Sequence, residues 1–159
     1  MMTRRSWLAG MTALGLGAAA AQQATRKRSD QISLSDAEWK ARLTPEQYLV
    51  LRREGTERPH SSALNNEKRS GAYHCAGCDL PLFSSATKYE SGTGWPSFYD
   101  ALPGALGFKT DFKLIYPRTE YHCARCGGHQ GHVFDDGPRP TGKRYCNNGV
   151  ALKFVAGDA

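Results

Sequence analysis

The chain has 159 residues, which is enough for one domain and short for two. With 40% hydrophobic and 23% charged residues, its composition is ordinary for a globular protein and argues against the disordered and integral-membrane classes. The formal charge is +6; Arg4 and Arg5 contribute to it, and the remaining excess is scattered along the chain. A scattered excess is typical of a solvated surface, so we do not expect nucleic acid as a partner.

Residues 1–24 are predicted to be an export signal. The stretch MMTRRSWLAGMTALGLGAAAAQQA has a basic start, a short apolar run and an Ala-x-Ala-like end. Its paired arginines resemble a twin-arginine signal, with Trp7 where phenylalanine is usual. We therefore expect a bacterial, periplasmic protein without stable membrane association after cleavage. An uncleaved membrane anchor is the alternative, but residues 6–21 are short for a bilayer span and rich in glycine and alanine.

Two short helices are predicted at the start of the folded domain. Ser35 and Glu38 form the S-x-x-E pattern of a capping box, which opens the first helix. Thr44 is placed to cap a second helix that has Pro45 at its first position, and Gly55 follows its last turn.

Residues 35–157 are predicted to form one domain, which a polar linker over residues 25–34 joins to the export signal. Beyond the two helices, ten of the 17 glycines fall between Gly92 and Gly149. Short runs rich in β-forming residues lie among the turns: AYHC, LPLFSS, FKTDFKLIYP, EYHC, HVF, KRYCN and VALKFV. This texture predicts a compact antiparallel β domain, with the two helices lying across one end.

Four of the five cysteines form two matching knuckles. YHCAGC contains Cys75 and Cys78, and YHCARC contains Cys123 and Cys126. Two Cys-x-x-Cys pairs are the usual way to build a four-thiolate zinc site, and four thiolates leave no open position for catalysis. We therefore predict one structural zinc per chain, which ties two distant parts of the domain together. Two disulfides or a redox dithiol are the alternatives in an exported protein.

The fifth cysteine, Cys146, stands alone and is the candidate nucleophile. Lys143 and Arg144 precede it, and nearby cations favour the thiolate over the thiol. In an extended strand Asn148 points to the same side as Cys146, so it is the better of the two following asparagines to assist there. A buried, inert cysteine is the alternative.

Two further segments carry candidate helpers. GHQGHVF contains His129 and His132, which a regular strand would place on opposite faces but a glycine-rich turn can bring inward together. Histidine is the natural proton donor near neutral pH, although a single histidine is more often structural. SGTGWPSFY is an aromatic loop on a glycine hinge, in which Trp95 belongs either to the core or to the wall of a small apolar pocket.

Taken together, these motifs resemble the B-type methionine sulfoxide reductases, which reduce the R epimer of methionine sulfoxide. The resemblance runs from about Leu34 to Val155. It rests on four stretches in the family's order: NNEKRSGAYHCAGCDLPLF, SGTGWPSF, YHCARCGGHQGHVFDDGPRPTGKRYCNNG and LKF. It implies a mainly β, β-barrel-like fold of two small antiparallel sheets with short N-terminal helices and a structural zinc on the two knuckles.

The resemblance also implies a reaction. The Cys146 thiolate would attack the electrophilic sulfur of the sulfoxide, while His129, His132 and Asn148 would polarise and protonate its oxygen. Trp95 would hold the methyl group against an apolar wall and so select one epimer. Methionine then leaves, and Cys146 becomes a sulfenic acid. The implied substrate is oxidised methionine in proteins or peptides.

The chain departs from the family pattern at three positions. Many members carry a resolving cysteine where this chain has Thr93, and there is no sixth cysteine. We therefore expect an external thiol, such as a thioredoxin-like protein, to reduce the sulfenic acid of a monomeric enzyme. His60 and Gly149 are the other departures. A zinc-ribbon-like binding module and a general thiol–disulfide oxidoreductase are the rival functions, and neither would need Cys146.

Overall fold

The structure is a computed structural model that describes residues 28–157. The predicted export signal and the first three residues of the predicted linker lie outside the described residues. Within residues 28–157, no helix is both long and apolar enough to span a membrane.

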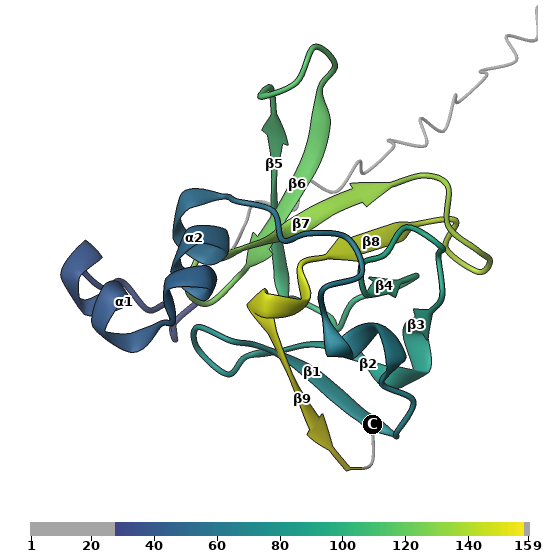
Figure 1. The fold of residues 1–159 in the computed structure, drawn as a ribbon, viewed down its shortest axis with the longest axis horizontal. Helices are drawn as coiled ribbons and strands as arrows, with labels where there is room; N and C mark the ends of the chain where they lie inside the picture. Colours follow the sequence, from purple (N-terminus) through teal and green to yellow (C-terminus); the bar gives the residue numbers. More distant parts are fainter. Residues whose placement is uncertain (1–27, 158–159) are drawn as a thin grey trace, which may run out of the picture.

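The two predicted helices are confirmed, and they lie together at one end of the β domain (Figure 1). They are α1 (Asp36–Arg42) and α2 (Pro45–Arg53), and each begins with a complete capping box, at Ser35 and Thr44 respectively. The chain turns out of α2 at Glu54, which adopts the left-handed conformation with φ of 54°. Glycine is usual at this position, but here the Glu54 carboxylate pairs with Lys109 and Lys113.

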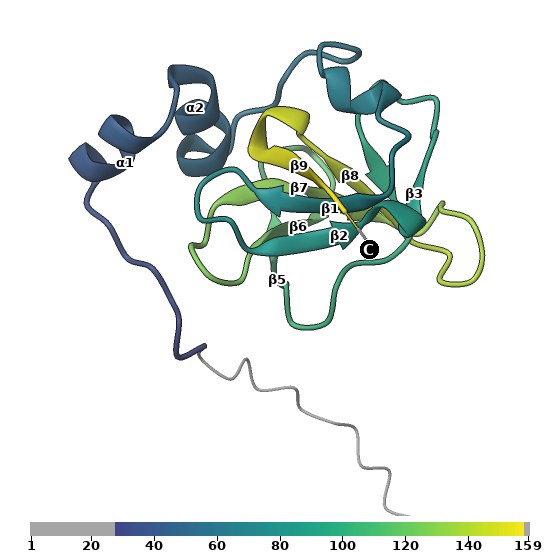
Figure 2. The same cartoon turned by 90° about the horizontal axis from the view of Figure 1, so that it is seen from below.

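The rest of the domain consists of two antiparallel sheets, as expected. The smaller sheet has three strands in the order β2 (Pro81–Ser84), β1 (Gly71–Cys75) and β9 (Leu152–Ala156). The larger has six strands in the order β3 (Lys88–Tyr89), β4 (Ser97–Phe98), β8 (Arg144–Asn147), β7 (His129–Phe134), β6 (Arg118–Cys123) and β5 (Leu106–Asp111). Figure 2 shows the smaller sheet lying against the larger one. Short 3-10 turns complete the described chain at Ala63–Asn66, Ser85–Thr87 and Gly149–Ala151.

Aromatic side chains fill the space between the two sheets. The Phe83 ring, from the smaller sheet, stacks on Phe98 of the larger at a centroid distance of 4.2 Å. Tyr73 joins from β1, and Tyr121 and Tyr145 close the cluster from β6 and β8. Burial of such large apolar surfaces stabilises the fold, at roughly 25 cal/mol for each Å² removed from water. The core therefore fixes which face of β8 is turned inward.

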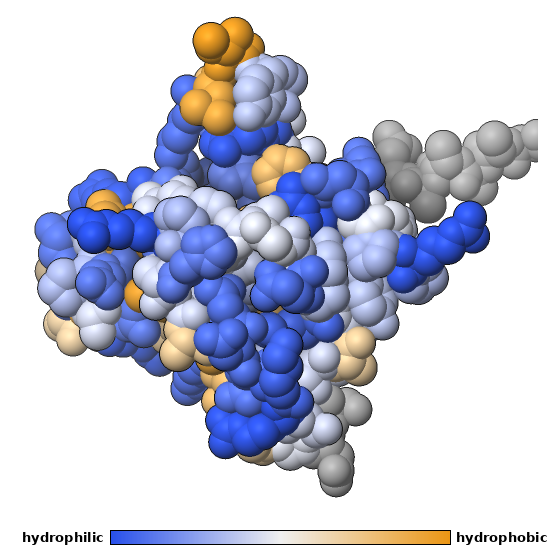
Figure 3. Space-filling view, turned by 45° about the vertical axis from the view of Figure 1, so that its right-hand side comes forward, coloured by the Kyte–Doolittle hydropathy of each residue, from blue (hydrophilic) through white to orange (hydrophobic). Residues whose placement is uncertain are grey.

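One predicted strand is shorter in the structure than its sequence suggests. The run FKTDFKLIYP reads as a single strand, but β5 ends at Asp111 and residues 112–117 form a turn that projects from the domain (Figure 1). Asp111 causes this ending, because its side chain accepts a hydrogen bond of 2.8 Å from the N–H of Lys113. The apolar residues beyond it are consequently exposed, and they form the orange tip at the top of Figure 3.

Candidate active site

The strand register places Cys146 in a row of polar side chains across the larger sheet. Cys146 on β8 lies opposite Ser97 of β4 and opposite His132 of β7. His132 in turn lies opposite Glu120 of β6. Residues directly opposite each other project from the same face of a sheet. Tyr145, the neighbour of Cys146, projects into the aromatic core, so this row occupies the other face.

A bulge in β7 brings the two histidines of the sequence motif to one face. The pairing of β6 with β7 shifts its register just before His122, which pairs with His129, so Gln130 is an extra residue on β7. One extra residue reverses the alternation of the strand, which puts residues three apart on the same side. The rings of His129 and His132 accordingly lie 5.5 Å apart. The bulge does what the sequence interpretation assigned to a glycine-rich turn.

An open cavity of about 140 Å³ lies over Cys146. It brings together four of the residues singled out from the sequence, Cys146, His132, Trp95 and Asn148. His129 is almost fully buried and does not line it. The cavity also has walls that the sequence did not reveal, from Thr56, Arg118, Gly131, Phe134 and Asn147. A thiol and an imidazole between aromatic rings suit a small apolar group that bears one polar atom.

His132 is held by a carboxylate at the base of the projecting hairpin. Its Nε2 lies 2.7 Å from Oδ2 of Asp111, which also pairs with Arg118 at 2.7 Å. The N–H of Lys113, together with His132 and Arg118, holds the pKa of Asp111 well below its usual range. An ionised carboxylate only accepts, so Nε2 of His132 carries the proton and Nδ1 is the basic nitrogen. Burial lowers the pKa of His132, so it is neutral at pH 7 and able to accept a proton.

His129 is also held by a carboxylate, but it is buried behind the cavity wall. Its Nδ1 lies 2.7 Å from Oε1 of Glu120, whose other oxygen is 3.0 Å from the Lys109 ammonium. Burial lowers the pKa of His129 to about 4, so its imidazole is neutral at physiological pH. Among the described atoms its Nε2 has no hydrogen-bond partner. His129 therefore supports the row from below the surface and does not face the cavity.

The expectation that neighbouring cations favour the Cys146 thiolate holds for Arg144, but burial outweighs its effect. Burial raises the pKa of the Cys146 thiol, and the guanidinium of Arg144 and the hydroxyl of Thr93 offset this only in part. Arg144 forms two hydrogen bonds of 2.8 Å to Asp136. The Lys143 ammonium is turned away to Asp135, at 2.5 Å. Desolvation thus prevails over charge, and the Cys146 side chain is a thiol at rest.

Replacing Arg144 with glutamine is expected to shift the alkylation of Cys146 by iodoacetamide to higher pH. The guanidinium lowers the pKa of this thiol, so its removal leaves burial less opposed and the thiolate forms at a more alkaline pH. The measurement is the alkylation rate between neutral and alkaline pH, read at Cys146 by peptide mass spectrometry. Lys143→Gln is the matched control and should leave the profile unchanged. A shift to lower pH, or equal shifts in both variants, would contradict this account.

A half-buried glutamate that the sequence did not single out links the walls of the cavity. The backbone of Glu57 accepts a hydrogen bond from the Trp95 indole at 3.2 Å and donates one to the Asn148 side chain at 3.0 Å. Its carboxylate accepts from the N–H groups of Gly149 and Val150, at 2.6 and 2.9 Å. Burial nevertheless raises the pKa of Glu57. Within TERPH a glutamate reads as a surface charge, and no local pattern distinguishes it.

Asn148 lines the cavity while its amide serves the scaffold. Its Nδ2 donates to the backbone carbonyl of Gln130 at 2.9 Å, and its Oδ1 accepts from Glu57. These bonds hold the end of β8 against the bulge of β7 and against the loop that contains Glu57. Asn148 therefore positions the walls of the cavity.

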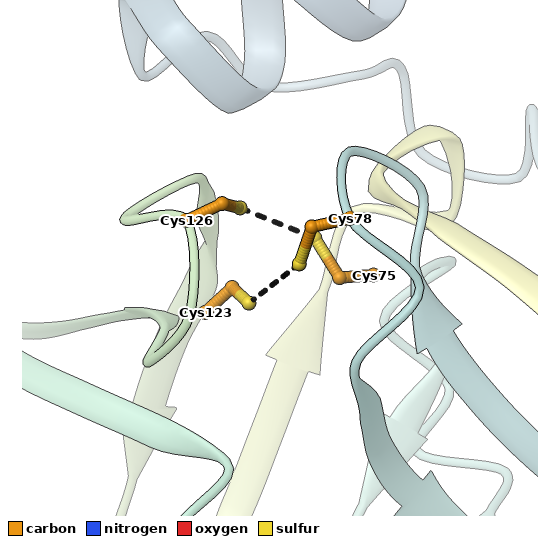
Figure 4. A group of neighbouring side chains, drawn as sticks. All are labelled: Cys75, Cys78, Cys123 and Cys126. Carbon is orange, nitrogen blue, oxygen red and sulfur yellow. Dashed lines mark hydrogen bonds between the residues drawn. The ribbon is translucent and has the colours of Figure 1, made fainter. Parts of the chain in front are cut away.

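The other four cysteines meet in a buried cluster, as the sequence predicts. Their Sγ atoms all lie within 4.8 Å of one another, with 3.6 Å between Cys75 and Cys126 and 3.4 Å between Cys78 and Cys123. Figure 4 shows one knuckle, from the β1–β2 turn, facing the other, from the β6–β7 turn. A tetrahedron with Zn–S bonds of about 2.3 Å has edges of about 3.8 Å, so the four sulfurs fit such an ion. All five cysteines are free thiols in the described chain, which does not support the disulfide alternative.

Gln130 joins this cluster to the cavity. Its side-chain Nε2 lies 3.4 Å from Sγ of Cys75, and its Oε1 lies 3.4 Å from Nδ2 of Asn147 on β8. Its backbone carbonyl accepts from both nitrogens of Asn148. Gln130, which forms the bulge, thus contacts both the four-cysteine cluster and the strand that carries Cys146.

Known proteins resemble most of the chain. The SelR domain model matches residues 43–156. The chloroplastic peptide methionine sulfoxide reductase B1 of Arabidopsis thaliana is 53% identical over 131 residues, which cover 82% of this chain and 65% of the relative. The peptide methionine sulfoxide reductase MsrB of Methanosarcina barkeri is 56% identical over 124 residues, which cover 77% of this chain and 87% of the relative. The MsrB of Leptospira interrogans is 53% identical over 125 residues, which cover 78% of this chain and 95% of the relative.

The chain thus spans less than two thirds of the plant relative and most of the archaeal and bacterial ones. Both cysteine knuckles, the aromatic loop, the histidine motif and Cys146 lie within the residues that the SelR model matches. The chain therefore belongs to the SelR domain family, the family of the MsrB-type peptide methionine sulfoxide reductases.

Proposed function

We propose that this protein reduces the R epimer of methionine sulfoxide in proteins and peptides, with Cys146 as the nucleophile. The observation that carries the proposal is the cavity in which the one cysteine outside the buried cluster meets His132 and Trp95. Family membership supports the same activity. A thiol is the reductant that a sulfoxide requires, and an aromatic wall fits the methyl group beside its sulfur.

The residues divide the reaction between them. His132 takes the proton of the Cys146 thiol at Nδ1, and Asp111 holds the imidazole in that tautomer from Nε2. The thiolate then attacks the sulfur of the sulfoxide, and the same proton is delivered to its oxygen. In the resulting adduct the protonated oxygen moves from the methionine sulfur to the Cys146 sulfur. Its bond to the methionine sulfur and the S–S bond both break, methionine leaves as the thioether, and Cys146 becomes a sulfenic acid. Asn148 keeps the pocket wall in register, and His129 supports His132 from the buried side.

The metal of the four-cysteine cluster is proposed to be zinc, one ion per chain. Four thiolates at tetrahedral spacing favour zinc over harder cations such as magnesium or calcium. Because Cys75, Cys78, Cys123 and Cys126 would fill its coordination sphere, zinc would supply folding energy and take no part in the reaction.

Recycling is proposed to depend on an external dithiol, such as a thioredoxin-like protein, acting on a monomer. The first thiol displaces water from the sulfenic acid and forms a mixed disulfide with Cys146. The second thiol then releases Cys146 and leaves the reductant oxidised to a disulfide. Thr93 is a pKa-lowering partner of Cys146, and a threonine cannot form the disulfide that a cysteine there would form.

Assays with the two separated sulfoxide epimers of a blocked methionine, with dithiothreitol as reductant, test the function. We expect turnover of the R epimer and none above background of the S epimer. The result depends on no protein reductant, so it isolates the cavity from the recycling partner. Turnover of the S epimer in place of R would remove the assignment.

The protein is further proposed to act in the periplasm of a bacterium. The support is the arginine pair and the apolar run in residues 1–24, which resemble a twin-arginine signal. N-terminal sequencing of the protein from a periplasmic extract tests this. A mature N-terminus within residues 19–25 is expected, and recovery of the intact chain in the cytoplasm would exclude it.

A further inference from the structure

The tip of the β5–β6 hairpin, residues 112–116, carries apolar side chains that the fold does not use. Phe112 is 75% exposed and Ile115 is fully exposed, and Leu114 and Tyr116 are also exposed. This segment is the projection at the top of Figure 3, where its most hydrophobic residues appear in orange. A group of exposed apolar side chains on one projection marks an interaction site more often than a packing accident.

The base of this hairpin is part of the cavity over Cys146. Asp111 ends β5 and pairs with Arg118, the first residue of β6. Arg118 lines the cavity, and Asp111 binds His132. Ile115 is three residues from Arg118, so at most about 11 Å of extended chain separates the tip from the cavity wall. A polypeptide with one side chain in the cavity therefore passes within reach of the tip.

The charges around the hairpin favour an uncharged, apolar partner. The ammonium groups of Lys109 and Lys113 both pair with Glu54, and Lys109 also pairs with Glu120. Arg118 pairs with Asp111. These cations are neutralised within the protein, so the tip stands on a charge-balanced base. An anionic lipid surface would need unpaired cations beside the apolar residues. An apolar stretch of polypeptide needs none.

We propose that the hairpin tip binds apolar side chains that flank the oxidised methionine in an extended polypeptide. The inference rests on the proposed function and extends it to the choice among substrates. Methionine is largely a core residue, and its oxidation disrupts the packing around it, which exposes apolar neighbours. Contacts of those neighbours with the tip would add binding energy beyond that of the sulfoxide itself.

The test uses the combined variant Leu114→Ser, Ile115→Ser, Tyr116→Ser with dithiothreitol as reductant. Its substrates are the blocked single-residue R sulfoxide, a peptide with leucine and valine on either side of the sulfoxide, and a peptide with serine and asparagine there. We expect the variant to lose about tenfold in kcat/KM on the apolar peptide and to match wild type on the other two substrates. Val155→Ser, which removes an exposed apolar side chain from β9 of the other sheet, should change none of the three.

Each other outcome overturns the inference in a recognisable way. Equal losses on all three substrates would assign the tip to the cavity or to folding. Undiminished preference for the apolar peptide would remove the tip from substrate binding. A loss of activity seen only with a thioredoxin as reductant would assign the tip to that partner. The tip would be assigned to membranes if wild type, but not the variant, bound phosphatidylglycerol vesicles while the peptide kinetics of the two were the same. Wild type inactive on all three substrates would instead overturn the proposed function, and this inference with it.

Discussion

Replacement of Cys146 with serine is expected to abolish reduction of the blocked R sulfoxide, with a loss on the order of 10³-fold or more in kcat. The hydroxyl is nearly the size of the thiol, so the cavity keeps its shape. It is far less acidic and far less nucleophilic than a thiol. An alcohol also cannot take up the sulfoxide oxygen to give a product that dithiothreitol could reduce. The steady-state rate of methionine formation is the measurement.

The same variant should keep its fold, because Cys146 is half-buried on the face of the sheet away from the aromatic core. An unchanged melting temperature and an unchanged metal content establish that the lost activity is chemical. Turnover within a few-fold of wild type would show that another group is the nucleophile. Since the other four cysteines are clustered, the assignment of Cys146 would then be untenable.

The second large effect is expected at the metal cluster, where Cys126→Ser should release the metal and unfold much of the domain. Structural zinc contributes roughly 10 kcal/mol or more of binding free energy in small domains. The free energy of unfolding of a whole domain is only about 5–15 kcal/mol. Loss of one of four thiolates therefore removes a contribution comparable to the entire stability. Metal content by mass spectrometry and thermal unfolding by circular dichroism measure both consequences.

Cys146→Ser serves again as the matched control, since it also removes one thiol but lies outside the cluster. It should bind one zinc per chain and melt with wild type. If Cys126→Ser retained both its metal and its melting temperature, the cluster would not be a metal site. Two rapidly alkylated thiols in the metal-free wild type, with the fold intact, would instead favour a redox dithiol at one knuckle.

Local signals account for the parts of the fold that the sequence predicts well. The capping boxes at Ser35 and Thr44 lie within a few residues of each helix start, and the structure contains both. The cysteine knuckles are equally local, because the spacing of each pair sets the geometry of its turn. Their meeting in space is long-range, and the repeated pattern of four cysteines predicted it.

The features that sequence could not supply depend on distant partners. Glu57 is a polar residue in a polar loop, and its role is set by backbone groups some 90 positions away. Gln130 becomes a bulge only because of how β6 pairs with β7. Burial is the largest influence on the pKa of Cys146 and raises it, which the sequence does not reveal, while the adjacent Arg144 lowers it only in part. The exposed tip reads as a strand because its residues are β-formers, and only the Asp111 turn interrupts it.

The depth of Cys146 bears on how the protein survives its own surroundings. Hydrogen peroxide oxidises thiolates much faster than thiols, and exposed sulfur faster than covered sulfur. Burial keeps this sulfur protonated at rest, and in the proposed reaction its ionisation awaits a bound sulfoxide and the base His132. If Cys146 is the nucleophile, as proposed, the oxidants that damage methionine elsewhere would therefore leave its sulfur largely intact between turnovers.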